Sequence, residues 1–424
     1  MKEKLFSRRS DLEKNSHKSY FTLHGTIDKY MEQKMKNIVI VGGCGHVGIP
    51  LGLALADAGN KVTLLDINEK AVAAILSGTL PFMEEGGDEL LQKHLGKNVT
   101  ATTNEATIKE QDTVIFITGT PVDEHLNPRV SDVTKVITHY MPLLREDQLI
   151  VLRSTIYPGT VRNVENLFAR EGKKVLLSFC PERILQGKGI EEIHKLPQIV
   201  SGISKEAEDA ASDLFSQIAK SIIRLTPEEA ELAKLMTNSW RYLEFAIANQ
   251  FYMMATAHGL DFYRIYDAMT KDYPRAAHFA RPGLAAGPCL FKDTMQLASF
   301  HDNQFFLGHS AMLVNEGLPN VLVNQLMEKM GGLKNKKIAI LGMTFKANND
   351  DIRESLSFKV KKLLEMRMAY VIESDPCWKE GTVSLEEALK EAEGVIIATP
   401  HNEYKGIRLS VPFVDCWGIA AKGE

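Results

Sequence analysis

Cysteine is scarce in this chain, and the sequence holds no clustered pattern of metal ligands. The 424 residues include five cysteines, which are widely spaced and form no CxxC pair and no Cys/His cluster. This distribution excludes the usual zinc motifs and a disulfide framework, so we predict no metal. An odd and sparse set of thiols is typical of reduced cysteines in the cytosol, and we expect a cytoplasmic protein.

Long apolar runs and a basic excess are also missing. No segment is long and apolar enough to span a bilayer, so we expect no membrane association. The basic residues 1–34 lack the apolar core of a signal peptide, and we interpret them as a weakly ordered extension without a function. A net charge of −4 argues against a nucleic-acid partner. The composition that remains, 44% hydrophobic and 25% charged, is that of a globular protein of two or three domains.

Short apolar runs alternate with helical segments in the first half of the chain. Asn37–Val41 and Lys61–Asp66 are typical of buried strands, with a helix expected between them from about Val47 to Ala58. Further strands are predicted at Thr113–Thr118, Gln148–Arg153 and Lys174–Phe179. This alternation predicts a parallel, doubly wound sheet in a domain at residues 35–226.

The pattern changes after Pro227. Residues 228–258 contain no glycine or proline, and they predict a helix of roughly 45 Å that bridges domains or packs against a partner chain. We place a central helical domain at residues 227–332. The alternation resumes in a smaller domain at residues 333–424, with a helix expected at Ser357–Met366 and strands at Lys337–Leu341 and Gly394–Ala398. The predicted fold class is α/β, with two Rossmann-like domains whose parallel sheets are joined by a long central helix.

A glycine-rich turn follows the first predicted strand and opens a helix. The sequence Gly-Cys-Gly-His-Val-Gly at 43–48 is a G-x-G-x-x-G pattern, which allows a pyrophosphate to approach backbone N–H groups at a helix N-terminus. Asp66 ends the next strand, where a carboxylate binds the ribose of NAD and repels the 2′-phosphate of NADP. The alternatives are a similar turn that binds nothing and a simple strand-end role for Asp66. The predicted NAD contacts are Gly43, Gly45, His46, Val47, Gly48 and Asp66.

Two further features of the sequence indicate candidate catalytic residues, namely a polar stripe on the long helix and a cysteine after it. At 100° per residue, five polar residues of the long helix fall within roughly 80° of one another; they are Glu231, Lys234, Asn238, Arg241 and Asn249. The stripe supplies oxyanion donors, or it is a solvated face, which periodicity alone slightly favours. Cys289 lies among turn-forming residues just before Lys292. A thiol near a cation can act as a nucleophile, although a lone cysteine is more often a small buried hydrophobe.

The chain from about Met35 to Trp417 resembles the nucleotide-sugar (UDP-sugar) 6-dehydrogenase family. Ordered segments carry the resemblance, and they are Gly43–Pro50, Pro81–Gly86, Gly119–Pro121, Ser154–Thr160, Cys180–Gly187, Ala230–Asn238, Gly287–Asp293 and Gly342–Ser355. The resemblance implies two Rossmann-like domains around a long helix, NAD as the cofactor, a UDP-sugar as the substrate, and a homodimer or higher homo-oligomer.

The resemblance also implies roles for individual residues. The implied catalytic residues are Cys289, Lys234, Asn238, Asp293, Glu182 and Thr120. The implied NAD contacts beyond the glycine turn and Asp66 are Thr120, Ser154, Thr155 and Glu182. The implied substrate contacts are Glu182, Arg183, Lys234, Asn238, Arg241, Arg275, Gly283, Phe345, Lys346 and Arg353. Arg275 matches an arginine that, in the family, reaches the substrate of a neighbouring subunit.

The reaction implied by the resemblance is the oxidation of a C6 primary alcohol to a carboxylate with two NAD per sugar. Asp293, relaying through water, or Lys234 removes the alcohol proton. Cys289 captures the aldehyde as a thiolate and then forms a thioester. Water held by Thr120, Glu182 and Asp293 hydrolyses the thioester, while Lys234 and Asn238 stabilise the oxyanions.

Several alternatives remain open at this stage. The chain could be a two-electron dehydrogenase of related fold, or a non-catalytic nucleotide-binding scaffold. Glu182 could be a loop salt-bridge partner, and Lys346 and Arg353 could form a solvated charged pair with the neighbouring aspartates. Pro288 departs from the family pattern because it removes a backbone N–H beside Cys289. The motifs favour a UDP-N-acetylhexosamine as the substrate, with UDP-glucose next.

Overall fold

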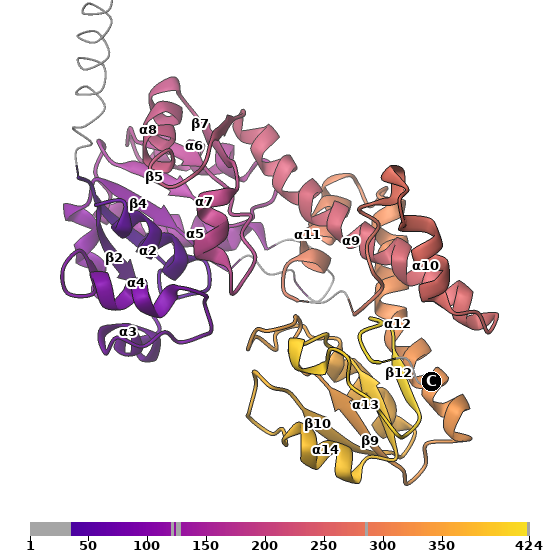
Figure 1. The fold of residues 1–424 in the computed structure, drawn as a ribbon. Helices are drawn as coiled ribbons and strands as arrows, with labels where there is room; N and C mark the ends of the chain where they lie inside the picture. The colour runs from indigo at the N-terminus through magenta and orange to yellow at the C-terminus, as the bar shows by residue number, and fades with distance from the viewer. Residues whose placement is uncertain (1–34, 120–122, 124–128, 285–286, 422–424) are drawn as a thin grey trace, which may run out of the picture.

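The computed structural model describes residues 35–119, 123, 129–284 and 287–421. The predicted extension at residues 1–34 and the predicted role of Thr120 lie outside this set. Two sheets, one in each half of the chain, flank a long helix (Figure 1). The predicted α/β class with two Rossmann-like domains is confirmed. No helix within the described ranges is both long and apolar enough to cross a membrane.

The first sheet has eight strands in the order β3-β2-β1-β4-β5-β6-β7-β8. Its strands are β1 (Asn37–Val41), β2 (Lys61–Leu65), β3 (Val99–Thr102), β4 (Thr113–Phe116), β5 (Leu149–Leu152), β6 (Leu176–Phe179), β7 (Gln198–Gly202) and β8 (Ile222–Arg224). The order reverses between β1 and β4, which creates a crevice at the carboxyl ends of these strands. All neighbouring pairs are parallel except β6 and β7, which are antiparallel. An antiparallel strand toward one side of a parallel sheet is common in such folds.

Helices cover both faces of this sheet. They are α2 (Gly48–Asp57), α3 (Glu69–Leu76), α4 (Gly87–His94), α5 (Val130–Tyr140), α6 (Thr160–Arg170), α7 (Gly189–Lys195) and α8 (Lys205–Phe215), with short 3-10 helices η2 (Glu105–Glu110) and η3 (Met141–Leu143). Alternate residues of β1 enter opposite cores, because successive side chains of a strand point to opposite faces. Ile38 and Ile40 belong to one core, whereas Val39 and Val41 belong to the other.

The central segment begins with α9 (Pro227–Ala257), a 31-residue helix. A capping box between Thr226 and Glu229 and a proline in the first turn fix its start. The other elements of this segment are α10 (Phe262–Thr270), η4 (Pro274–Ala276), α11 (Leu290–Phe300) and α12 (Phe306–Met330). Figure 1 shows α9 leaving the first sheet and running toward α10 and α12.

The second sheet has four parallel strands in the order β10-β9-β11-β12. Its elements are β9 (Lys337–Leu341), α13 (Ser357–Met366), β10 (Tyr370–Ser374), α14 (Leu385–Glu391), β11 (Gly394–Ile397), η5 (Asn402–Tyr404) and β12 (Phe413–Asp415). The helix predicted at Ser357–Met366 and the strand predicted at Lys337–Leu341 are confirmed to the residue.

The polar stripe of α9 faces the protein interior. Glu231, Lys234, Asn238 and Asn249 are each less than 9% exposed, and Arg241 alone is exposed. The interpretation of this stripe as a solvated face is therefore wrong for four of its five residues. Periodicity cannot decide this point, because it shows which residues share a face but not which face is covered.

Candidate active site

A cleft of about 1580 Å³ lies where the first sheet, α9, the segment before α11 and the C-terminal domain meet. The predicted site residues that line it are Gly45, His46, Val47, Asp66, Ser154, Thr155, Glu182, Arg183, Lys234, Asn238, Arg241, Cys289, Phe345, Lys346 and Arg353. Five predicted residues are not among its lining residues, namely Gly43, Gly48, Arg275, Gly283 and Asp293. Local patterns scattered over some 300 residues thus converge on one cavity.

The glycine turn between β1 and α2 fits a dinucleotide pyrophosphate. A Cβ placed on Gly45 would meet nothing closer than 3.8 Å, so this face of the turn is open to a ligand. A Cβ on Gly48 would lie 2.5 Å from the Gly43 carbonyl oxygen, so Gly48 serves the close crossing of helix and turn. Asp66 accepts a hydrogen bond from the backbone N–H of Cys44 at 3.0 Å, which places the carboxylate beside the turn. An open Gly45 and a close-packed Gly48 are the features that a dinucleotide-binding turn requires, and the ribose contact of Asp66 stays a prediction.

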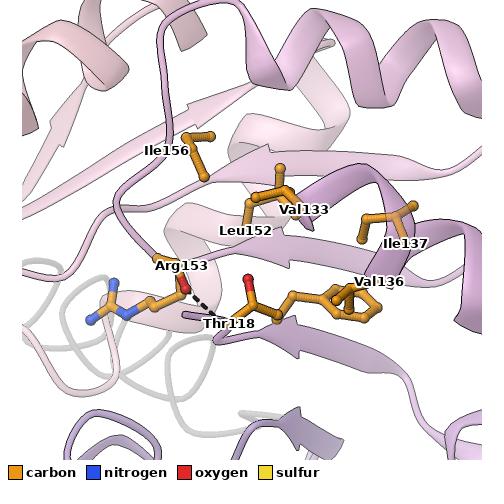
Figure 2. A pocket seen from close by; sticks show the side chains of 9 residues that line it. Thr118, Val133, Val136, Ile137, Leu152, Arg153 and Ile156 are labelled. Carbon is orange, nitrogen blue, oxygen red and sulfur yellow. Dashed lines mark hydrogen bonds between the residues drawn. The ribbon is translucent and has the colours of Figure 1, made fainter. Parts of the chain in front are cut away.

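The loops after β4 and β5 complete this side of the cleft. Thr118 donates its backbone N–H to Ser154 Oγ at 2.7 Å, drawn as the dashed line in Figure 2. This bond closes one side of a small, mainly aliphatic cavity of about 10 Å³, which is too small for a cofactor ring. Ser154 is therefore engaged with the neighbouring loop, and Thr155 also lines the large cleft.

His46 joins the cofactor turn to the C-terminal domain. Its ring stacks on Phe82 with centroids 3.9 Å apart, and its Nε2 lies 3.8 Å from Asp351 Oδ2. Burial, followed by the charge of Arg353, lowers the pKa of His46. The ring is therefore neutral at pH 7, and its contribution at this junction is mainly packing.

Cys289 lies at the N-terminus of α11 and lines the cleft. The residue is open to solvent, yet the cleft walls surround the thiol, and this burial is the largest cause of a raised pKa. Asp293 raises the pKa further, whereas the cations Lys234, Lys292 and Arg353 oppose the shift. Cys289 lines a large cavity and does not belong to a hydrophobic core. The structure therefore does not support the alternative of an inert, packed cysteine.

Asn238 and Asp293 form a buried pair below Cys289. Asn238 Nδ2 donates to Asp293 Oδ2 at 2.6 Å, and Lys292 Nζ lies 3.3 Å from Asp293 Oδ1. Asp293 itself is fully buried, so it reaches the cleft only through a neighbouring group or a water. Lys234 is buried beside the pair, and desolvation lowers the pKa of its ammonium although Asp293 and Cys289 act in the opposite sense.

Glu182 is paired with an arginine that the sequence analysis did not single out. Arg153 follows β5 and is 1% exposed, and its Nη2 forms an ion pair with Glu182 Oε2. Glu182 Oε1 accepts backbone N–H groups from Arg183 and Ile184 at 2.7 and 3.1 Å. Glu182 therefore forms a salt bridge, as one of the alternatives in the sequence analysis predicted. The same side chain also lines the cleft. The sequence feature that could have indicated this pairing is the position of Arg153 at the end of a predicted buried strand.

The C-terminal domain contributes cations and an aromatic wall. Lys346 Nζ donates to the Gln186 carbonyl at 2.9 Å across the cleft, and burial lowers its pKa. Arg353 makes a forked pair with Asp351, with distances of 2.6 to 3.0 Å, yet remains exposed to the cleft. Phe345 packs so closely on Gly287 that a Cβ there would lie 2.5 Å from its ring.

The segment before Cys289 is clamped from two sides. Asn249 Nδ2 donates to the Gly283 carbonyl at 3.0 Å, and its Oδ1 accepts the Gly283 N–H at 2.8 Å. A Cβ on Gly283 would lie 2.1 Å from the ring of Trp417. Gly283, predicted as a substrate contact, is thus placed as a close-packing glycine that fixes the path of the chain toward Cys289.

The other predicted arginines differ in placement. Arg183 lines the cleft, and its Nη2 donates to the Pro197 carbonyl. Arg241 is an exposed residue of α9 at the edge of the same cleft. Arg275 is exposed and lies against Tyr273, away from the cleft of its own chain.

One group of possible metal ligands occurs in the described residues, namely Asp375, Cys377 and His401. Asp375 Oδ2 already accepts the backbone N–H groups of Met343 and Thr344 and faces His401 Nε2 at 3.2 Å. His401 Nδ1 accepts the Asn348 N–H at 3.0 Å. Because these acceptors are already engaged, the cluster links the segment after β10 to the neighbouring loops through hydrogen bonds. Asp66, after β2, forms a similar link to the turn that contains Cys44.

The fold and the cleft define a dehydrogenase with separate domains for a dinucleotide and for its substrate. Models of the UDP-glucose/GDP-mannose dehydrogenase family match the chain in three parts. The NAD binding domain matches residues 36–219, the central domain residues 228–316, and the UDP binding domain residues 339–419. The chain belongs to this family, and it is an NAD-dependent nucleotide-sugar dehydrogenase.

Individual relatives agree with this assignment. The UDP-N-acetyl-D-mannosamine dehydrogenase of Pyrococcus horikoshii is 30% identical over 87% of this chain and 90% of its own length. The solved UDP-glucose dehydrogenase of Pyrobaculum islandicum has a TM-score of 0.86 at 26% identity, covering 92% of this chain and 96% of that chain. The solved UDP-D-ManNAc dehydrogenase of Pyrococcus horikoshii has a TM-score of 0.81 at 28% identity, covering 88% of this chain and 91% of that chain.

The glycine turn gives a test that separates cofactor binding from folding. Gly45→Ala places a methyl group on the open face of the turn, so we expect NADH affinity to fall by about tenfold or more, with the melting temperature nearly unchanged. Gly48→Ala is the matched control, and it should lower the melting temperature, because its Cβ lies 2.5 Å from the Gly43 oxygen. Fluorescence titration with NADH and thermal denaturation measure the two effects. Unchanged NADH binding by Gly45→Ala would contradict this use of the turn.

The charges around Cys289 predict opposite effects of two substitutions. Because the thiol pKa is raised, alkylation by iodoacetamide should accelerate as the pH rises above neutrality. Lys234→Met removes a cation that lowers the pKa of Cys289, so it should slow alkylation at a fixed pH. Asp293→Asn removes a negative charge that raises the same pKa, so it should accelerate alkylation. Mass spectrometry of the peptide that contains Cys289 gives the rates, with Cys289→Ser as the control. Equal rates for both variants would refute this electrostatic account.

Proposed function

We propose that this enzyme oxidises the C6 alcohol of a UDP-sugar to a carboxylate in a four-electron oxidation, made of two hydride transfers, with Cys289 as the covalent nucleophile. The observation that carries the proposal is the placement of the thiol. It opens into the cleft at a helix N-terminus, close to the charges of Lys234 and Lys292. We retain the domain limits 35–226, 227–332 and 333–424, with the last domain binding the nucleotide of the substrate.

The first oxidation needs an acceptor for the alcohol proton. Asp293 is fully buried and bonded to Asn238, so it acts through a water rather than by direct contact. Lys234 is the second candidate, because burial lowers the pKa of its ammonium and brings proton exchange closer to neutral pH. NAD would accept one hydride in each oxidation when bound, so two NAD are used per sugar.

Covalent capture retains the aldehyde between the two oxidations. Cys289 transfers its proton to Lys234, whose pKa is lowered by burial, and the thiolate attacks the aldehyde carbon. The product is a tetrahedral thiohemiacetal whose oxyanion needs donors. Lys234 and Asn238 supply N–H groups from adjacent turns of α9, and both line the cleft near Cys289. Since Asn238 is held by Asp293 at 2.6 Å, its amide is oriented before the substrate binds.

The second oxidation leaves a thioester, which water hydrolyses. Glu182 and Asp293 orient this water in the proposal, and Thr120 would share the role from the loop after β4. The substrate's nucleotide and sugar contact the cleft cations and Phe345. The substrate contacts we propose are Glu182, Arg183, Lys234, Asn238, Arg241, Arg275, Phe345, Lys346 and Arg353. Gly283 contributes indirectly, through the path of the chain toward Cys289.

We favour a UDP-N-acetylhexosamine as the substrate and place UDP-glucose next. The segments Cys180–Arg183 and Asn238–Arg241 support this order, because they resemble the branch that oxidises N-acetylhexosamine nucleotides. Relatives named as UDP-N-acetyl-D-mannosamine dehydrogenases match at 28–30% identity, against 27% for a UDP-glucose 6-dehydrogenase of Bacillus subtilis. These differences in identity are small, so the ranking depends mainly on the motifs.

The assembly we propose is a homodimer or a higher homo-oligomer. Five apolar side chains of α9 fall within about 60° of one another on the helix surface. They are Met236, Trp240, Ile247, Phe251 and Met254, and each is 41 to 58% exposed in the single chain. A contiguous apolar stripe opposite a buried polar one favours a protein partner. The exposed Arg275 would then reach the cleft of the neighbouring subunit.

Counting NADH tests the reaction. A panel of UDP- and GDP-sugars identifies the best substrate, and complete conversion of a limiting amount should yield two NADH per sugar and the corresponding uronic acid. Cys289→Ser should lower turnover by about a thousandfold or more, because the serine hydroxyl is a much weaker nucleophile than a thiolate. One NADH per sugar, or undiminished turnover of Cys289→Ser, would favour the two-electron alternative.

The apolar stripe of α9 predicts the oligomeric state. Trp240→Glu together with Phe251→Glu should convert the assembly to monomers, because a charge in a buried contact loses its hydration. Light scattering after size-exclusion chromatography measures the mass, and circular dichroism checks the fold. Met366→Glu is the control, since Met366 is 77% exposed on α13, away from the stripe. A wild-type protein that elutes as a monomer would refute the proposed assembly.

A further inference from the structure

Arg153 is a buried charge to which the proposed mechanism gives no role. It follows β5 at the carboxyl edge of the first sheet, and it is among the largest side chains that are fully buried. Figure 2 shows its guanidinium turned away from the aliphatic cavity beside Leu152 and Ile156. A charge that is 1% exposed is retained only if other groups compensate for its lost hydration.

The compensation comes from one short segment. Arg153 Nη1 donates to the Cys180 carbonyl at 2.8 Å, and Nη2 pairs with Glu182. The ring of Phe215 covers the guanidinium, with the central carbon 4.6 Å from the ring centroid. The backbone closes the arrangement, since the Glu182 N–H donates to the Arg153 carbonyl at 3.2 Å. Arg153 therefore fixes both the side chain and the main chain of Glu182.

The carboxylate of Glu182 has donors on both oxygens. Oε1 accepts the Arg183 and Ile184 N–H groups, while Oε2 faces the guanidinium. Loss of the negative charge on this carboxylate would leave Arg153 as an uncompensated charge in the interior, which is unfavourable. Glu182 still lines the cleft, beside Lys234. It can therefore accept one more hydrogen bond there, while its negative charge compensates the buried guanidinium.

We propose that Arg153 is a positioning residue that holds Glu182 as a fixed anion, so that Glu182 orients the hydrolytic water and does not remove its proton. This inference rests on the proposed thioester route. In that step the water oxygen bonds to the thioester carbon, and the carbon–sulfur bond breaks with its electron pair on the sulfur. One proton ends on the thiol, and the other leaves through the Asp293 side of the site.

Rapid-mixing kinetics test this role with the full-length enzyme, NAD and the best UDP-sugar. In Arg153→Met both oxidations should persist, giving a burst of two NADH per active site. The steady state that follows should be at least tenfold slower than in the wild type, because the water is no longer oriented. Acid-quenched Arg153→Met should carry a sugar thioester on Cys289 by mass spectrometry.

Two further variants test the partner and the charge. Glu182→Gln should give the same burst as Arg153→Met. Arg153→Lys keeps the charge and should restore part of the steady-state rate.

Rescue by a conservative variant separates positioning from general support of the fold. Arg153→Lys can still pair with Glu182, so it should recover part of the hydrolysis step, whereas a change that only weakens the fold should lower the burst and the steady state together. Phe215→Leu is the control, because it loosens the packing over Arg153 and leaves the ion pair intact. If Arg153→Met does not fold, Arg153→Lys still tests the role, because it should give the two-NADH burst and a steady state between those of the wild type and Glu182→Gln.

Three results would overturn the role of Arg153. They are a burst and a steady state that fall together, wild-type turnover in Arg153→Met, and a steady-state rate that is no higher in Arg153→Lys than in Arg153→Met. A wild type that yields one NADH per sugar and no adduct on Cys289 has a different meaning. It would overturn the thioester route itself, and the inference about Arg153 would fall with it.

Discussion

The polar face of α9 is buried, and every polar group that is removed from water needs a partner. This constraint organises the molecule around the helix. Glu231 accepts backbone N–H groups at the start of α6 at 2.7 and 2.9 Å, which ties the helix to the NAD domain. Asn238 holds Asp293, and Asn249 holds Gly283 on both its N–H and its carbonyl. One helix thereby fixes the cofactor domain, the nucleophile segment and the acid beneath it.

The electrostatics of the cleft follow from the same burial. Desolvation raises the pKa of Cys289 and lowers that of Lys234. Both shifts favour the neutral forms, so the resting site contains a thiol beside a lysine that gives up its proton more easily than a solvated one. Proton transfer between them costs less than either ionisation in isolation, since the resulting opposite charges stabilise each other. This pairing supports the thiolate that we propose as the nucleophile.

The two nucleotide-binding halves meet directly at the cleft rather than only through α9. Lys346 donates to the Gln186 carbonyl, and the Met83 N–H donates to Asp350 at 3.1 Å. His46, in the cofactor turn, lies beside Asp351, which in turn holds Arg353. Cofactor and substrate sites therefore share a wall, which agrees with a reaction that moves a hydride between the two ligands.

The sequence by itself determined the local elements: β1, β9, the glycine turn and α13 lie where apolar periodicity and turn residues predict them, because these signals act between near neighbours in the chain. Most of the site residues that the motifs indicated also line the cleft. Only the tertiary structure decided which face of α9 is buried, that Asp293 lies beneath the cleft, and that Arg153 pairs with Glu182, 29 residues away. Burial and long-range ion pairs depend on which segments come together in space, and no local pattern records that.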